Sequence, residues 1–223
     1  MILSVDASAV TASAALTDGD KIIRNEFINK GLTHSETLLP MIKRVMDGIP
    51  FSELEAIAIT AGPGSFTGVR IGVATVKGIA FKFETPCIPV STLEAIAYGF
   101  TDENAVICAV MDARRMQFYN ALFKVGNGEF KRLTPDRAIS IDDLRDELKA
   151  FERVIVAGDG ARLCMENIAL DNCEIACEEL VYQNAVCVAK AAENKKRIPP
   201  KELMPLYLRP SQAERELKLK KGE

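Results

Sequence analysis

The stretch Gly62-Pro63-Gly64-Ser65-Phe66-Thr67-Gly68-Val69-Arg70-Ile71-Gly72 lies between two segments of different periodicity. Residues 54–61 alternate in the manner of a β-strand, and residues 67–83 are typical of a helix. Glycine tolerates positive φ and lets other atoms come close to the backbone. A glycine-rich turn from a strand into a helix therefore indicates either an anion held at the helix N-terminus or a closely packed second helix.

The helix after this turn has an unusual face of small residues. Gly68, Gly72 and Thr75 share one side, and Ala74 and Gly78 share another. Each glycine inside a helix costs about 1 kcal/mol relative to alanine. The close approach of a neighbouring helix would offset that cost.

On the N-terminal side of the turn, the sequence predicts a β-meander followed by a helix. Residues 2–5, 11–16 and 21–28 read as strands, with a hairpin turn at Asp18-Gly19. Thr33 and Glu36 have the spacing of a capping box, which marks a helix start. An apolar stripe follows on that helix, formed by Leu38, Ile42 and Val45.

On the C-terminal side, polar residues 101–104 mark an expected boundary between two domains, 1–101 and 102–210, with a charged tail at 211–223. The sequence predicts these further strands and helices: a short extended piece at 88–90, strands at 106–111, 117–125 and 153–157, and helices at 91–98, 141–150, 162–169 and 184–196. The segment Leu3–Ser8 resembles Ala109–Arg114, since both are strands that reach an aspartate before a second strand. This echo suggests two similar domains.

Composition excludes some classes of protein. The 223 residues carry 28 basic and 31 acidic side chains, a net charge of -3, which argues against a chain that grips nucleic acid backbone by itself. The N-terminus predicts no secretory leader, and no apolar run is long enough for a membrane span. The six cysteines form no C-x-x-C pair, so reduced thiols and a cytoplasmic location are expected.

Several motifs together resemble the TsaB (YeaZ) family, whose fold belongs to the ASKHA class of actin-like and Hsp70-like ATPases. The motifs are Asp6-Ala7-Ser8, Thr33-His34-Ser35-Glu36, the run Gly62–Gly72, Ser91-Thr92-Leu93, Met111-Asp112-Ala113-Arg114-Arg115, and Pro205-Leu206-Tyr207-Leu208-Arg209. The resemblance covers nearly the whole chain. It implies an α/β fold of two similar actin-like domains, each with a mixed sheet flanked by helices.

The resemblance also implies a function. Members of this family are non-catalytic partners of TsaD, which transfers a threonylcarbamoyl group to the tRNA adenosine beside the anticodon with the help of the ATPase TsaE. ATP and metal are then expected on the partner subunits, and no cofactor is expected on this chain. A homodimer is the alternative assembly when the partner is missing. Contact with tRNA is expected to be weak or indirect, and no membrane contact is expected.

His34 is the only histidine in the chain. The related TsaD family holds a metal with an H-x-x-x-H pair on the equivalent helix, whose two imidazoles lie one turn apart. Here the second position is Leu38. We therefore expect neither a metal site nor a catalytic residue on this chain.

For the glycine run, the sequence favours an interface over an anion site. The expected interface with a TsaD-like partner, or with a second copy, consists of Leu38, Ile42, Val45, Gly68, Gly72 and Thr75. In the alternative, Ser65 and Thr67 would donate hydrogen bonds to an anion and Arg70 would balance its charge.

A vestigial nucleotide site is the second alternative, and it corresponds to an independent ASKHA-type ATP-binding enzyme. Asp6 occupies the position that binds Mg²⁺ and phosphate in such ATPases, but Ser8 stands where they have glycine. Asp112 and the turn Gly158-Asp159-Gly160 would complete such a site. The residues assigned to this vestigial contact are Asp6, Ser8, Gly64, Ser65, Arg70, Gly158 and Gly160.

Overall fold

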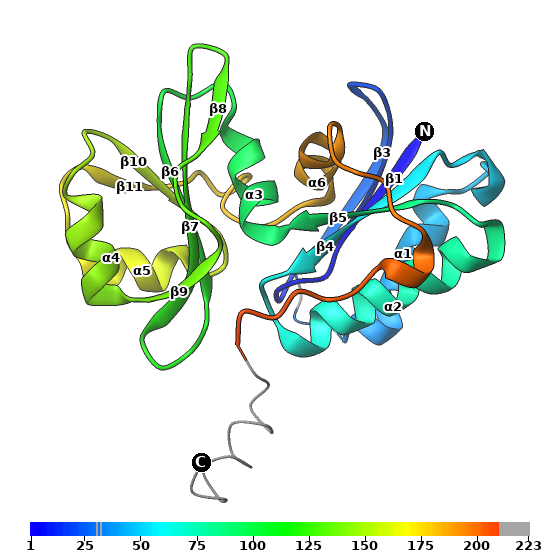
Figure 1. The fold of residues 1–223 in the computed structure, drawn as a ribbon, viewed down its shortest axis with the longest axis horizontal. Coiled ribbons are helices and arrows are strands. Elements are labelled where there is room, and N and C mark those ends of the chain that lie inside the picture. The colour runs from blue at the N-terminus through cyan, green and yellow to red at the C-terminus, as the bar shows by residue number, and fades with distance from the viewer. Residues whose placement is uncertain (30, 32, 210–223) are drawn as a thin grey trace, which may run out of the picture.

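The computed structural model describes residues 1–29, 31 and 33–209, and it contains two β-sheets with helices packed against them (Figure 1). The charged tail expected at 211–223 lies outside the described residues. Each sheet contains both parallel and antiparallel strand pairs. The expected α/β fold with two mixed, helix-flanked sheets is confirmed.

The first sheet has the strand order β3-β2-β1-β4-β5. Its first three strands pair antiparallel in sequence order, which confirms the predicted meander. β4 and β5 then add in parallel to β1. The strands are β1 (Ile2–Asp6), β2 (Ala12–Asp18), β3 (Lys21–Ile28), β4 (Ala56–Gly62) and β5 (Cys87–Ser91).

Helices cover both faces of the first sheet, because its central strands are apolar on both sides. In β4, Ile57 and Ile59 point into one core, whereas Ala56 and Ala58 point into the other. The core of Ile57 and Ile59 is closed by α1 (His34–Val45) and α2 (Phe66–Phe83), and the core of the two alanines by α3 (Thr92–Ala97) and α6 (Ala185–Ala192).

The second sheet has the order β11-β10-β6-β7-β8, and β9 also pairs with β7. Its strands are β6 (Ala105–Asp112), β7 (Gln117–Gly126), β8 (Glu129–Arg132), β9 (Arg137–Ser140), β10 (Val154–Ala157) and β11 (Cys173–Ile175). Its helices are α4 (Ile141–Leu148) and α5 (Ala161–Ile168), and the short 3-10 turns of the chain are η1 (Phe51–Glu53), η2 (Tyr98–Phe100) and η3 (Pro200–Glu202).

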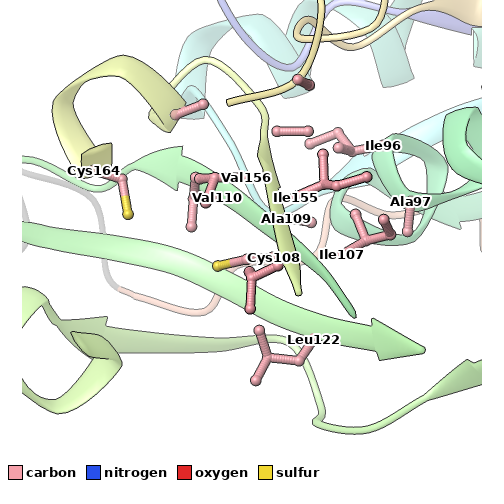
Figure 2. Close-up of a cluster of buried hydrophobic side chains, with 14 of the residues drawn as sticks. Ile96, Ala97, Ile107, Cys108, Ala109, Val110, Leu122, Ile155, Val156 and Cys164 are labelled. Atoms are coloured by element: carbon pink, nitrogen blue, oxygen red, sulfur yellow. The ribbon is translucent and has the colours of Figure 1, made fainter. Parts of the chain in front are cut away.

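We call the first sheet with its helices the first lobe and the second sheet with its helices the second lobe. In the core of the second lobe, successive side chains of β6 alternate between the two faces of the sheet (Figure 2). Cys108 lies on the side of the sheet that faces Cys164 of α5, whereas Ile107 lies on the side that faces Ile96 of α3. Burial raises the pKa of the Cys164 thiol to about 12, so this thiol behaves as an apolar core group. Of the six cysteines, only Cys177 is exposed, and none forms a disulfide.

Two kinds of local feature differ from the sequence-based expectations. The capping box is not formed: Thr33 is the N-cap of α1, but its side chain makes no capping hydrogen bond. The sequence did not predict β8, β9 and β11, which are strands of three or four residues. Short, half-exposed strands of this kind carry too few alternations to stand out from loops.

The chain returns to the first sheet before it ends. α6 packs across β1, β2, β4 and β5, and Leu203 is fully buried in the core beside α2. This return falls within the range 102–210 that the sequence assigned to the second domain. None of the described helices combines the length and apolarity required to span a membrane.

Candidate functional site

The glycine-rich turn joins β4 to α2 at the edge of the first lobe that faces the second lobe. Ser65 is the N-cap of α2, and its hydroxyl accepts a hydrogen bond from the Gly68 amide at 3.3 Å. The Ser65 amide in turn donates to the Ser8 carbonyl at 2.7 Å. This donor of the turn is therefore already occupied within the chain.

The close approach that the glycines permit is made by the chain itself. A side chain at Gly68 would overlap the carbonyl oxygen of Ala7, and one at Gly64 would overlap that of Ser8. A Cβ at Gly72 would lie 3.4 Å from the Ala7 Cβ and 3.2 Å from the Ile59 side chain. The glycine face of α2 thus packs on Ala7, just beyond β1, on Ile59 of β4 and on His34 at the start of α1.

The apolar stripe expected at a partner interface is core instead. Leu38, Ile42 and Val45 are at most 1% exposed and pack between α1 and the first sheet. Gly68 and Gly72 are buried as well, and only Thr75 is partly exposed. Amphipathic periodicity gives the buried face of a helix, so it cannot by itself distinguish an intramolecular contact from an intermolecular one.

The opposite faces of the same two helices are open and partly apolar. Leu39 of α1 is 41% exposed and Phe81 of α2 is 55% exposed. On α2, Gly78 and Ala74 precede Phe81 by about one and two helical turns. Both are exposed, and a Cβ at Gly78 would have no neighbour within 4 Å among the described residues. We call these four residues the outer α1–α2 face. The two helices pack side by side on the same face of the sheet (Figure 1).

Asp6 is fully buried at the end of β1. Its Oδ1 accepts hydrogen bonds from the Thr60 hydroxyl at 2.6 Å and the Ser8 hydroxyl at 2.7 Å. Burial raises the pKa of Asp6 above its ordinary value, although both hydroxyls oppose the shift. Asp6 and Ser8 are 0% exposed, so neither can touch a ligand in this conformation.

His34 closes the same corner from α1. Its Nε2 lies 2.7 Å from the Ala9 carbonyl oxygen, which ties the helix start to the loop between β1 and β2. Leu38, one turn further along α1, points into the core. Within residues 1–29, 31 and 33–209, no group of three or more histidine, cysteine or acidic side chains is placed to hold a metal.

A cavity of about 530 Å³ lies between the two lobes. One side carries the acidic groups Asp112 and Asp159, and the rim carries Arg114 and Arg209. The remaining lining residues are Ala9, Val10, Pro63, Gly64, Ser65, Phe66, Thr67, Met111, Ala113, Tyr119, Leu206, Tyr207 and Leu208. Of the residues expected at a nucleotide, Gly64, Ser65, Asp112 and Asp159 line this cavity, whereas Asp6, Ser8, Arg70, Gly158 and Gly160 do not.

Asp159 is the strongly perturbed group of the cavity. Burial raises its pKa to about 6, the carboxylates of Asp112 and Asp6 raise it as well, and a hydrogen bond from Gln183 lowers it in part. The amide of Gln183 donates to Asp159 Oδ1 at 3.3 Å. Asp159 is thus the group of this cavity that titrates near neutral pH.

The glycines beside Asp159 do not form an open cradle. Gly158 has φ +114°, and a side chain there would overlap the Val110 carbonyl oxygen. A Cβ at Gly160 would lie 2.9 Å from the Asp112 amide nitrogen. Both glycines are buried against the end of β6, so the close approach that they permit is made by the backbone of the chain itself.

Residues 206–209 line the cavity, and this role was not predicted from the sequence. The Leu206 amide donates to the Ala61 carbonyl at 2.7 Å, and the ring of Tyr207 stacks on Phe66 with centroids 4.7 Å apart. Figure 1 shows this segment running along α2 to the space between the lobes. Its sequence signal is the motif Pro205-Leu206-Tyr207-Leu208-Arg209, which contributed to the family resemblance but was assigned no role in a site.

The chain is similar to known proteins over most of its length. A model of the family described as TsaD, tRNA N6-adenosine threonylcarbamoyltransferase, matches residues 26–214. The tRNA threonylcarbamoyladenosine biosynthesis protein TsaB of Bacillus subtilis (strain 168) is 31% identical over 157 residues, 70% of this chain and 69% of that protein. The protein of the same name from Escherichia coli (strain K12) is 35% identical over 127 residues, 55% of this chain and 54% of its own length.

Solved structures agree with this at the level of the fold. The structure described as YeaZ from Pseudomonas aeruginosa has a TM-score of 0.78 at 24% identity and covers 93% of this chain and 99% of that chain. The ethanolamine utilization protein EutJ from Carboxydothermus hydrogenoformans has a TM-score of 0.51 at 9% identity, covering 85% and 88%. The fold is therefore of the ASKHA class. Because the family model and the Bacillus relative each match well over half of it, the chain belongs to the TsaB (YeaZ) family.

Proposed function

We propose that this chain is a non-catalytic subunit in the synthesis of threonylcarbamoyladenosine in tRNA, and that it binds and activates a TsaD-like protein in the cytoplasm. The names of its TsaB relatives support the pathway. The observation that carries the binding role is the outer α1–α2 face, where two large apolar side chains flank exposed small residues.

The shape of this face suits another helix. Alanine and glycine at positions 74 and 78 let a second helix approach α2 closely, because no side chain fills the groove between ridges. Leu39 and Phe81 would then be buried at the edges of the contact. Burying one such side chain contributes about 1.5–3 kcal/mol of hydrophobic free energy to binding. Each of the two side chains could therefore supply a large share of the binding energy.

A TsaD-like protein is the partner that fits this face best. The TsaD family model matches this chain over residues 26–214, so both proteins are expected to present an equivalent pair of helices. Two similar faces can pair about an axis close to twofold, and a second copy of this chain would use the same face when the partner is missing. A TsaE-like ATPase, ATP, metal and most of the tRNA contact would then belong to the partner subunits.

The non-catalytic role is supported by how the chain uses its own polar groups. The single histidine is bonded to the Ala9 carbonyl, and Asp6 is bonded to two hydroxyls in the core. The glycine positions of the expected nucleotide site are filled by backbone atoms of the chain itself. These groups position the lobes and are not free to act on a substrate.

Light scattering of the purified chain, alone and mixed with the TsaD-like protein of the same cell, tests the proposal. We expect a one-to-one complex that replaces any self-association. Gly78→Arg should abolish the complex while the fold survives, because its side chain would point into open space. Ala150→Arg, on an exposed position at the end of α4, is the matched control and should bind normally.

A partner that binds Gly78→Arg as well as the native chain would rule out the outer α1–α2 face. No complex at all, with ATP and a TsaE-like protein present, would favour the alternative of an independent ATP-binding enzyme, which calorimetry with ATP would then test on the lone chain. Gly68→Arg and Gly72→Leu do not serve as interface variants, because their side chains would disrupt the packing of α2 on β1 and on Ile59 of β4.

A further inference from the structure

The mouth of the cavity between the lobes combines stacked aromatic rings with arginine side chains. We define the cleft mouth as Phe66, Tyr207, Arg209 and Arg114, which line the cavity, together with Arg70, which contacts the Phe66 ring from outside that lining. The rings of Phe66 and Tyr207 are 4.7 Å apart at an angle of 28°. The guanidinium carbon of Arg70 lies 5.0 Å from the centre of the Phe66 ring. Tyr207 is 43% exposed, so its outer side is open to a further planar group.

Across the opening lies a strained turn between β6 and β7. Arg114, Arg115 and Met116 have φ values of 63°, 56° and 55°, which is the left-handed region. Non-glycine residues rarely adopt this conformation three times in succession. Asp112 Oδ1 holds the turn by accepting a hydrogen bond from the Arg114 amide at 2.6 Å. Backbone strain of this kind concentrates at binding sites, and here it presents two arginines to solvent.

The arginines of this region differ from others in the described part of the chain. Arg44, Arg132, Arg137, Arg145, Arg153, Arg162 and Arg197 each have a carboxylate within 4.0 Å. Among the described residues, Arg70, Arg114 and Arg115 have none, and Arg209 donates to the neutral amide of Gln117. Their charge is therefore available to an anionic ligand.

The carboxyl groups inside the cavity limit what that ligand can be. Asp112 and Asp159 line the same cavity as Arg114 and Arg209, and their carboxylates would repel a phosphate or an acidic peptide that came close to them. They would accept hydrogen bonds from the exocyclic amino group of a nucleobase. A cavity of about 530 Å³ can hold one nucleotide. These groups suit a base directed inward and a phosphate held at the rim.

We propose that the cleft mouth binds single-stranded RNA, with one base stacked beside Tyr207 and its phosphate held by Arg114 and Arg70. Aromatic faces and arginine planes are the groups with which proteins bind unpaired bases. The choice of RNA over DNA as the ligand rests on the proposed function. The existence of the binding site is argued from the contacts at the cleft mouth and does not depend on that function. The site is separate from the outer α1–α2 face, so binding of RNA and binding of a partner can fail independently.

Fluorescence anisotropy with short labelled single-stranded RNAs tests the proposal on the full chain without a partner. Oligonucleotides of adenosine or cytidine should bind more tightly than those of uridine, because uracil has no exocyclic amino group. Tyr207→Ala should weaken binding about tenfold through lost stacking. Arg114→Glu should weaken it by a similar factor and reduce its dependence on salt between about 50 and about 200 mM.

Lys21→Glu is the matched control, since Lys21 is an exposed residue of β3 and does not line the cavity. It changes the net charge as Arg114→Glu does, and it should leave binding within about twofold. Any one of three results would overturn the proposal. The two charge variants could lose the same amount of binding, Arg114→Glu could bind RNA as tightly as the native chain, or micromolar AMP could displace the RNA. Because Arg114 and Tyr207 lie on different segments, a folding defect in one variant leaves the other as the test.

Discussion

Among single side chains, the two aspartates beside the cavity show how burial changes an ionisable group. Asp6 is fully buried and Asp159 is half-buried, and desolvation is the largest cause of the raised pKa of each. Both accept hydrogen bonds from neutral donors only. The charged form of each is therefore less favourable in the folded chain than in the unfolded chain, which makes the stability depend on pH.

The pH dependence can be isolated at Asp159. Its pKa rises from 3.8 to about 6 on folding, so the stabilisation it provides is complete below the unfolded value and is lost as the pH rises through 6. In Asp159→Asn this loss is absent. As the pH is raised from about 4.5 to about 7.5, we expect the free energy of unfolding of the variant to increase relative to that of the native chain by on the order of 1 kcal/mol.

Urea denaturation of both proteins at the two pH values measures this difference. Asp146→Asn is a suitable control: a hydrogen bond from Lys149 lowers the pKa of Asp146 below 3.8, so that group is charged at both pH values. Its substitution should have the same effect at either pH. A gain for Asp159→Asn that does not change with pH, or that becomes smaller as pH rises, would contradict the burial of this carboxyl group.

Among the elements, helix α2 has one buried face and one open face. Gly68 and Gly72 face the end of β1 inside the chain, whereas Ala74 and Gly78 face outward. The inner glycines are required because backbone and side-chain atoms occupy the space that a Cβ would need. The outer glycine has no such neighbour in the described part of the chain, so its presence points to a contact outside it.

Alanine substitutions at Gly68 and Gly78 should therefore have opposite effects on stability. At Gly68 the added Cβ would overlap the Ala7 carbonyl oxygen, and we expect a loss of about 2–4 kcal/mol in free energy of unfolding. At Gly78 the space is open, and the better helix propensity of alanine should add about 0.5–1 kcal/mol. Chemical denaturation of the two variants provides the comparison, and effects of equal sign would contradict this division of the helix.

The sequence predicted the longer elements because their periodicity reflects burial. The strands of the first sheet, α2 and the helix that starts near Ser91 follow directly from alternation and apolar spacing. The site was harder to predict. The stripe Leu38, Ile42 and Val45 carries the same pattern whether the covering surface is a sheet or a partner. The stacking of Tyr207 on Phe66 joins segments 141 positions apart, which no local pattern encodes.

In the whole molecule, a network of charged side chains connects the lobes on the side away from the cavity mouth. Glu94 of α3 pairs with Arg132 of β8 at 2.9 Å and with Lys195, beyond α6, at 2.8 Å. Arg132 also pairs with Asp136, whose other oxygen accepts from the Ser91 hydroxyl at 2.6 Å. The network connects β8 of the second sheet with α3 and with the segment after α6, so we expect it to help hold the two lobes together.

Removing the central charge should loosen the lobes. Glu94 is only 16% exposed, so Glu94→Gln leaves two half-buried cations without their shared partner, and we expect a loss of about 1–2 kcal/mol in free energy of unfolding. Hydrogen exchange should quicken in β8 and α6 before it does elsewhere. Glu178→Gln removes an ion pair whose members are 70% and 61% exposed, and should leave the free energy of unfolding nearly unchanged. If the two variants behaved alike, the network would not be holding the lobes together.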